Sequence, residues 1–409
     1  MLNIIWSGFF LSAFIVAVWQ TVANGNSQIW SDLANAAFDS SKNAFEITLA
    51  LTGMMCLWLG LLKIAEKSGL TEVLAKILRP LFRKMLPEIP ADSPAQGSMV
   101  MNMAANILGL DNAATPIGIK AMEQLQELNP HKEKASAAQI LFMVINTSSV
   151  TLLPISILMY RQQFGAVEPS MVFLPILLAT SVSTLVGFIS VAIAEKLPIF
   201  NRIVLGYLGA FLTFILGIAY FFATMDTENR IIYASLTANM ALFGIIIIFI
   251  TSGLIKHLNV YNVFIEGAKE GFDTAVRIIP YMVAMLVGIA VFRASGALDY
   301  LLAGCEYLIS LCHINGDFIP ALPTAFMKPL SGSGARAMMI ETIQNYGVDS
   351  FPALVSAVIQ GSTETTFYVL AVYFGAVKIV KTGSAVPCAL LADLAGICAA
   401  IGLSYLFWY

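Results

Sequence analysis

The sequence predicts an all-α polytopic membrane protein, with about nine transmembrane helices and two re-entrant hairpins arranged as an inverted repeat. Hydrophobic residues make up 58% of the 409 positions and charged residues only 11%, a balance that excludes an ordinary soluble domain. Several apolar runs reach the roughly 20 residues that a helix needs to cross a bilayer. One polar pattern also occurs twice within apolar segments, at Val144–Thr151 and Val358–Thr365.

The predicted spans follow from the apolar runs, taken in chain order. They are Leu2–Gln20, Phe45–Ala65, Ala138–Tyr160, Met171–Ala194, Ile203–Phe222, Ile231–Leu254, Ile278–Ala297, Phe351–Ala376 and Ala385–Trp408. The first span has no Lys or Arg before it and no clear small-x-small cleavage site, so we expect a retained helix and not a signal peptide. The net charge of −3 gives no indication of a nucleic-acid partner.

Two long segments are only half apolar and are interrupted by Gly, Pro and Asn. The first runs from Pro94 to Leu128 and the second from Gly316 to Gly347. Irregular backbone at membrane depth must be shielded by protein or must line a water-filled cavity. We therefore expect both segments to form re-entrant helical hairpins, with the Gly-, Asn- and Pro-rich stretch at each tip.

The repeat extends beyond the two polar patterns. Phe45-Glu46 before one helix matches Phe272-Asp273 before another, and Ser68-Gly69 matches Ser295-Gly296 at the same spacing. In both halves a broken hairpin and then a polar-centred helix follow. Because an odd number of spans separates the two starts, we expect the second repeat to be upside down. This architecture is typical of secondary transporters with a site at the membrane midplane.

The Lys and Arg residues of the loops determine the predicted orientation. If the N-terminus is cytoplasmic, the outer loops hold only Lys42, Arg161 and Arg230. The inner loops then hold Lys63, Lys67, Lys76, Arg79, Arg83, Lys84, Lys132, Lys134, Lys196, Arg202, Lys256, Lys269, Lys378 and Lys381. This arrangement places the C-terminal Tyr409 outside.

The tip of the first hairpin carries four candidate substrate-binding residues. They are Asn102, Asn106, Asp111 and Asn112. Asp111 or Asn112 could simply cap the helix that starts near Pro116. The two roles are compatible, because a helix N-terminus inside the membrane also offers free N–H groups to an anionic ligand.

The tip of the second hairpin carries four more. They are Lys328, Ser331, Ser333 and Arg336. Its glycines suit close backbone approach, whereas the GxxxxGK[ST] spacing of a phosphate-binding loop is absent. Basic residues at membrane depth need a partner, which could be Glu364, Asp111 or a bound anion. An internal ion pair with no ligand role is the alternative.

The polar-centred helices supply the remaining candidates. They are Asn146, Thr147, Ser148 and Ser149 in the first half, and Gln360, Ser362, Thr363, Glu364 and Thr365 in the second. Such side chains bind heteroatom-rich solutes or sodium, and they also serve as hydrogen-bonding contacts between helices. Two clusters at equivalent positions, each after a broken hairpin, favour a binding site over packing alone.

Two carboxylates are candidates for coupling transport to sodium or protons. They are Asp111 and Glu364, and the counterpart of Glu364 in the first half is Val150. The chain has no HExxH or GxSxG motif, so we expect no enzyme. Its five cysteines form no CxxC pair, and we expect neither a metal site nor a cofactor apart from the coupling ion.

The motifs together resemble a fusion of bacterial spore maturation proteins A and B. The stretch Asn102–Met122 is similar to the first protein, and Lys328–Arg336 and Gln360–Val369 are similar to the second. The join lies between about Leu254 and Val263, which gives an A-like half at 1–254 and a B-like half at 255–409. The resemblance implies a nucleoside-recognition (Gate) domain in both halves and a transport role in the bacterial plasma (inner) membrane.

The sequence therefore predicts an integral membrane secondary transporter for a small polar or anionic solute, nucleoside-like or carboxylate. We expect ion coupling, with the two hairpins acting as gates. The expected partners are the solute, membrane lipid and further copies of the chain, and no nucleic acid. A non-transporting membrane scaffold and a lipid flippase are the alternatives.

Overall fold

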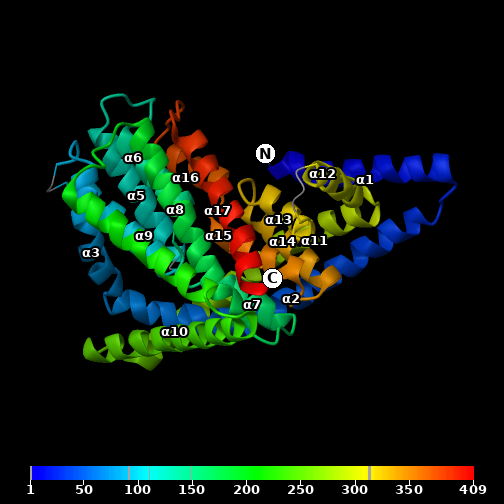
Figure 1. Cartoon of the computed structure of the whole chain (residues 1–409), viewed down its shortest axis with the longest axis horizontal. Coiled ribbons are helices and arrows are strands. Elements are labelled where there is room, and N and C mark those ends of the chain that lie inside the picture. Colours follow the sequence, from blue (N-terminus) through cyan, green and yellow to red (C-terminus); the bar gives the residue numbers. More distant parts are fainter. Residues whose placement is uncertain (1, 91–92, 110, 149, 312–314) are drawn as a thin grey trace.

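The computed structural model describes residues 2–90, 93–109, 111–148, 150–311 and 315–409, without the side chains of residues 2, 111–113 and 227–228. The described residues form helices joined by loops (Figure 1). Seven of these helices are long and apolar enough to cross a membrane. They are α1 (Leu2–Asn24), α2 (Ile29–Lys67), α8 (Phe173–Ala194), α9 (Arg202–Ala223), α10 (Thr227–Ile255), α11 (Val260–Ala294) and α17 (Ala385–Trp408). The chain is a multi-pass, all-α membrane protein, as predicted.

The two polar-centred spans are not single helices, contrary to their predicted bounds. The first is divided into α6 (Ala137–Thr147) and α7 (Ile155–Gln163), and the second into α15 (Phe351–Ser362) and α16 (Thr366–Ala376). Each interruption falls on the repeated polar pattern. We call residues 148 and 150–154 the first break and residues 363–365 the second break.

Both predicted hairpins are present. The first consists of α4 (Pro94–Ile107) and α5 (Asp111–Leu128), and the second of α13 (Leu322–Met327) and α14 (Gly332–Tyr346). Ser331 caps the N-terminus of α14 by accepting a hydrogen bond from the backbone N–H of Gly334 at 3.0 Å.

Each repeat also contains a helix that follows its first long span. These helices are α3 (Leu70–Met85) and α12 (Ala297–Ser310). The residues before them, Gly69 and Gly296, have φ angles of 79° and 77°, a conformation that favours glycine. The matching Ser-Gly pairs therefore mark the same turn in both halves. Neither helix was predicted as a membrane span.

The two repeats are inverted relative to each other. α2 and α11 cross closely, with Gly267 against Leu59 and Gly271 against Met55. Residue numbers rise along one helix as they fall along the other, so these equivalent helices are antiparallel. α8 and α17, the last helices of the repeats, also pack together. α9 and α10 connect the two halves.

Buried apolar side chains form two main cores, and each broken helix passes from one to the other. The first core is built from α3–α6 together with α16, and the second from α7 and α13–α15 together with parts of α2 and α11. α7 thus packs in the core of the second repeat, and α16 packs in that of the first. Figure 1 shows α15–α17 between the two groups of helices. The breaks are where the chain crosses.

Candidate functional site

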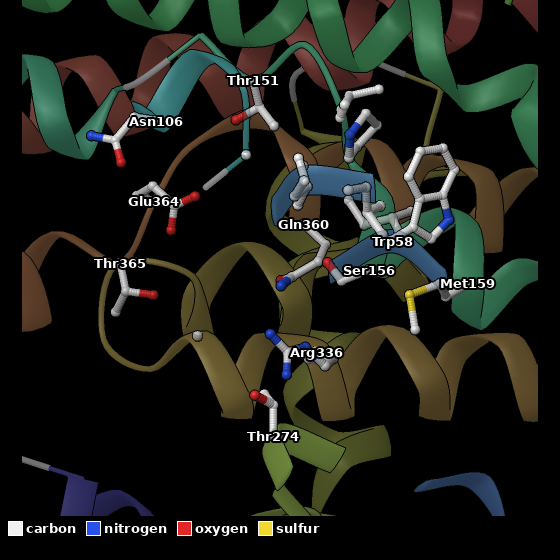
Figure 2. Close-up of a pocket in the computed structure, with 18 of the residues that line it drawn as sticks. Trp58, Asn106, Thr151, Ser156, Met159, Thr274, Arg336, Gln360, Glu364 and Thr365 are labelled. Atoms are coloured by element: carbon white, nitrogen blue, oxygen red, sulfur yellow. The ribbon is translucent and has the colours of Figure 1, made fainter. Parts of the chain in front are cut away.

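A cavity of about 540 Å³ lies where the two cores meet. Its wall combines α2, α7, α11, α14, α15 and α16 with both hairpin tips and both breaks. Figure 2 shows labelled side chains of α2, α7, α11, α14, α15, the first hairpin and both breaks around the same space. Eight predicted site residues line it: Asn106, Asn146, Lys328, Arg336, Gln360, Thr363, Glu364 and Thr365. The volume suits a small organic solute.

Backbone hydrogen bonds tie the irregular segments together at the cavity. The N–H of Leu152 in the first break donates to Ile107 O at the first hairpin tip, at 3.1 Å. The N–H of Phe367, after the second break, donates to Pro329 O at the second tip, at 3.0 Å. The breaks also meet each other, because Glu364 N–H donates to Thr147 O at 2.7 Å. Protein partners therefore satisfy these groups of the irregular backbone, as membrane depth requires.

An uncharged network supports the first break. Asn106 Nδ2 donates to Asn146 Oδ1 at 2.7 Å, and Tyr373 OH donates to the same oxygen at 3.1 Å. Asn102, which is fully buried, donates to Ala114 O at 2.7 Å and to Tyr373 OH at 3.2 Å. The network joins the first hairpin, α6 and α16. It presents amide groups to the cavity through Asn106 and Asn146.

Charged groups surround the second break. Lys328 ends α13, is only 4% exposed, and donates from Nζ to Gln360 O at 2.7 Å. This carbonyl lies in the last turn of α15, where the helix dipole favours a cation. Glu364, by contrast, is exposed to the cavity. The second break therefore carries the fixed charges that the first network lacks.

Arg336 places a second cation in the cavity wall. Its guanidinium carbon lies 5.9 Å from the centre of the Tyr160 ring, within cation–π range. Its Nε is buried without a hydrogen-bond partner among the described residues. In the view of Figure 2, the guanidinium lies between the side chains of Gln360 and Thr274. Arg336 and Lys328 give this part of the cavity the chemistry to bind a negatively charged group.

Several predicted site residues lie in the wall and not at the cavity surface. The hydroxyls of Thr147 and Ser148 both donate to Val144 O, and that of Ser362 donates to Ile359 O. These groups satisfy their own helix ends. Asn102, Ser331 and Ser333 are likewise absent from the lining, with Ser331 capping α14. Ser149 and the side chains of Asp111 and Asn112 lie outside the described residues.

One end of the cavity has a charged rim. Lys63 lies 3.2 Å from Glu66 and 3.0 Å from Glu270, and all three residues line the cavity. The neighbouring pair of Lys67 and Glu266, at 2.6 Å, also joins α2 to α11. Both acidic side chains of the first cluster are partly exposed, so this part of the lining reaches the protein surface.

Two residues of the site were missed in the sequence. Tyr373 lies in an apolar segment and nothing in its local pattern distinguishes it from a core residue. Asp393 lies in α17 and is 1% exposed, with Oδ2 accepting a hydrogen bond from Thr366 Oγ1 at 2.7 Å. An isolated carboxylate inside an apolar span is a signal of function that the sequence does contain.

Comparisons with known proteins agree with the repeat. A family described as nucleoside recognition (Gate) matches residues 48–164 and 275–380, more than half of the chain. Spore maturation protein A of Bacillus subtilis (strain 168) is 40% identical over 183 residues, 45% of this chain and 90% of that protein. Spore maturation protein B of the same organism is 48% identical over 149 residues, 36% of this chain and 82% of that protein. No solved structure matches the chain.

Proposed function

The chain belongs to the nucleoside-recognition (Gate) family of membrane proteins, and on that premise we propose that it is a secondary transporter of a small polar or anionic solute. The solute would be nucleoside-like or a carboxylate. The two matched segments each run from the first long helix of a repeat through its broken helix. The family resemblance therefore applies to the same parts of the chain that enclose the cavity.

The observation that carries the proposal is the cavity at the junction of both hairpin tips and both breaks. In inverted-repeat transporters the solute site lies at the repeat interface, among discontinuous helices. Here Asn106 and Asn146 belong to one repeat, whereas Arg336 and Gln360 belong to the other. A relative movement of the two cores would change access to the cavity without breaking either core, as alternating access requires.

The lining defines the class of solute. Lys328 and Arg336 provide positive charge for a carboxylate or phosphate, and the amides of Asn106, Asn146 and Gln360 provide donors and acceptors for a polar body. Trp58 lines the same cavity and could pack against a planar ring. We propose that one end of the solute is anionic and that the other is polar or aromatic.

Further parts of the functional prediction remain proposals. We propose coupling to sodium or protons through Asp111 or Glu364, a cytoplasmic N-terminus with the C-terminus outside, and assembly as a homo-oligomer in contact with lipid. We also propose the division into an A-like half at 1–254 and a B-like half at 255–409. That division falls at the C-terminal end of α10, shortly before α11 begins the second repeat, which supports it.

The test of transport is uptake of radiolabelled uridine, adenosine, succinate and glutamate into proteoliposomes. We expect saturable uptake of one class and at least a tenfold loss of uptake in Arg336→Ala. The matched control is Arg202→Ala, which removes an exposed arginine at the start of α9 and should leave uptake unchanged. Uptake that Arg336→Ala does not alter would contradict the anion site.

The scaffold alternative makes a different prediction for the polar network. If the polar residues serve only packing, Thr363→Val should lower stability or partner binding, and no tested solute should cross the membrane. A transporter should lose solute flux in Thr363→Val while the protein stays folded. Movement of fluorescent phospholipid between the two leaflets, together with no uptake of uridine, adenosine, succinate or glutamate, would instead favour a lipid flippase.

A further inference from the structure

Asp393 is a buried carboxylate that the proposed solute site does not use directly. It lies midway along α17, a helix of 24 residues, and its residue is 1% exposed. Oδ2 accepts the hydroxyl hydrogen of Thr366, whereas Oδ1 is buried without a hydrogen-bond partner among the described residues. A carboxylate with an unsatisfied oxygen is costly in such surroundings. Its presence in a membrane helix therefore calls for an explanation.

The inverted repeat identifies the equivalent of Asp393 in the first half. A side chain at Gly187 of α8 would contact Ala392 of α17, and one at Gly396 of α17 would contact Ser183 of α8. Because Ser183 and Ala392 each lie four residues before the glycine on their own helix, the contacts are reciprocal. Gly187 and Gly396 are thus equivalent. Each helix also has a polar residue three positions before that glycine.

The two equivalent residues have different chemistry at the same place. Thr184, three residues before Gly187, donates its hydroxyl to Ser148 O at the first break. Asp393, three residues before Gly396, bonds Thr366 just after the second break. In the first repeat, a hydroxyl is therefore sufficient to link the last helix, α8, to the break. The carboxylate in the second repeat is not needed for packing alone.

Asp393 is connected to the cavity through the second break. Thr363 lines the cavity, and its Cγ2 faces Gly396, one turn after Asp393. Thr363 Oγ1, like Asp393 Oδ1, is buried without a hydrogen-bond partner among the described residues. The carboxylate thus lies behind the cavity wall, and Thr363 lies between it and the cavity.

Few charges face Asp393. Lys328, which lines the cavity, interacts electrostatically with the carboxylate. The helices α6, α8 and α15, which pack on α17, contain no ionisable residue, and α16 contributes only Tyr368 and Tyr373. Among the described side chains of α9 and α10, the charged residues Arg202 and Arg230 lie at the starts of those helices, and Glu364 in the second break faces the cavity.

We propose that Asp393 is a proton-binding site that couples occupation of the cavity by an anion to protonation of the chain. A proton fits this site better than sodium does. Sodium requires several oxygen ligands, whereas Lys328 already places a cation in this part of the molecule, where its Nζ donates to Gln360 O. A protonated carboxyl group, in contrast, gains a donor for the Thr363 hydroxyl and carries no charge.

The coupling follows from Lys328, and this part rests on the proposed transport function. Protonation of Asp393 removes a negative charge that interacts with Lys328, so the positive potential that Lys328 exerts in the cavity rises. An anion then binds more tightly, and by linkage the bound anion makes Asp393 bind its proton more tightly. The proton and the anion would therefore move together, with anion affinity increasing as the pH falls.

The proton site can be tested without any solute. We would record infrared spectra of the purified protein in nanodiscs between pH 4 and pH 10 and follow the carbonyl stretching band of protonated carboxyl groups. We expect a band that disappears as the pH rises, is absent from Asp393→Asn and Asp393→Thr, and persists in Glu364→Gln. Asp393→Thr introduces the residue of the equivalent position and guards against a folding defect of Asp393→Asn. A spectrum that neither substitution changes would overturn the proposal.

The coupling is tested with succinate, glutamate and uridine 5′-monophosphate as probes, by measuring binding across the same pH range. As the pH rises, we expect the affinity of a bound probe to weaken by up to about tenfold per pH unit, which is the limit for one linked proton. Asp393→Asn should abolish this dependence. A pH dependence that survives in Asp393→Asn would refute the coupling while leaving transport intact. If no probe binds, the proposed solute class fails, and the infrared titration alone decides the proton site.

Discussion

The two breaks occupy equivalent places in the fold but use different chemistry. The first is held by uncharged groups, with Asn146 Oδ1 accepting from Asn106 and Tyr373. The second is surrounded by Lys328, Asp393 and the exposed Glu364. Amide networks hold a geometry at all pH values, whereas buried charges respond to protons and to ligands. We therefore propose that the first break holds the geometry of the cavity, whereas the second break responds to protons and to ligands.

The largest expected effect is the loss of the first network. Asn146→Leu removes the acceptor of two hydrogen bonds, one from the half-buried Asn106 and one from the buried Tyr373. Each of the two unsatisfied groups costs about 1–3 kcal/mol, so we expect the free energy of unfolding to fall by about 2–6 kcal/mol. Thermal unfolding in detergent measures the change.

The control for this prediction is Asn239→Leu, at an exposed position of α10. It makes the same chemical change away from both breaks and should leave the unfolding temperature nearly unchanged. Equal effects of the two substitutions would show that the first network has no special structural role.

A double-mutant cycle on Lys328 and Asp393 tests the charged break. Lys328→Met should destabilise the wild type because it removes a cation that interacts with a buried carboxylate. In the Asp393→Asn background the same change should cost less, with a coupling energy of about 0.5–3 kcal/mol. The coupling energy is the difference between two changes in the free energy of unfolding, those that Lys328→Met causes with and without the carboxylate. Strictly additive effects would mean that the two groups do not interact.

Tyr373→Phe should have a smaller effect on the first network. It removes the hydroxyl that bonds Asn146 and Asn102 but keeps the ring, which stacks on Phe142 at 5.6 Å between centroids. Interhelical hydrogen bonds in membrane proteins contribute about 0.6 kcal/mol on average. We expect a destabilisation of about 0.5–1.5 kcal/mol by thermal unfolding. Tyr220→Phe, at an exposed tyrosine of α9, is the matched control and should have no effect.

The smallest effect is expected at the equivalent of Asp393. Thr184→Val removes one hydroxyl that donates to Ser148 O and keeps the shape of the side chain. We expect a loss of about 0.6 kcal/mol in stability and no change in the pH dependence of probe binding. A changed pH dependence in Thr184→Val would contradict the division of roles between the two breaks.

Much of the architecture could be predicted because irregular backbone in a membrane protein leaves a clear trace in the sequence. The Gly-, Asn- and Pro-rich segments became the two hairpins, and the matching Ser-Gly pairs became equivalent turns. The breaks were harder to predict. Hydropathy is averaged over a window, and the apolar residues on both sides of Ser148–Leu153 hide the interruption within one long run.

The site was predicted in part for a similar reason. Residue type identifies the polar positions, and eight of the predicted residues line the cavity. It does not say which way a hydroxyl points, and Thr147, Ser148 and Ser362 bond their own helix backbone. Tyr373 became part of the site only because α16 crosses into the other core. That crossing depends on tertiary packing, which a single sequence does not display.

The central claim is that the cavity binds a solute through Arg336 and the second break. The most direct measurement is the thermal stability of the purified protein with nucleosides, dicarboxylates and amino acids, each with and without sodium. A ligand at about a hundred times its dissociation constant should add about 2.7 kcal/mol to the free energy of unfolding. We predict this gain for one class, lost in Arg336→Ala and kept in Arg202→Ala. A gain that Arg336→Ala retains in full, or no gain with any member of the panel, would contradict the account.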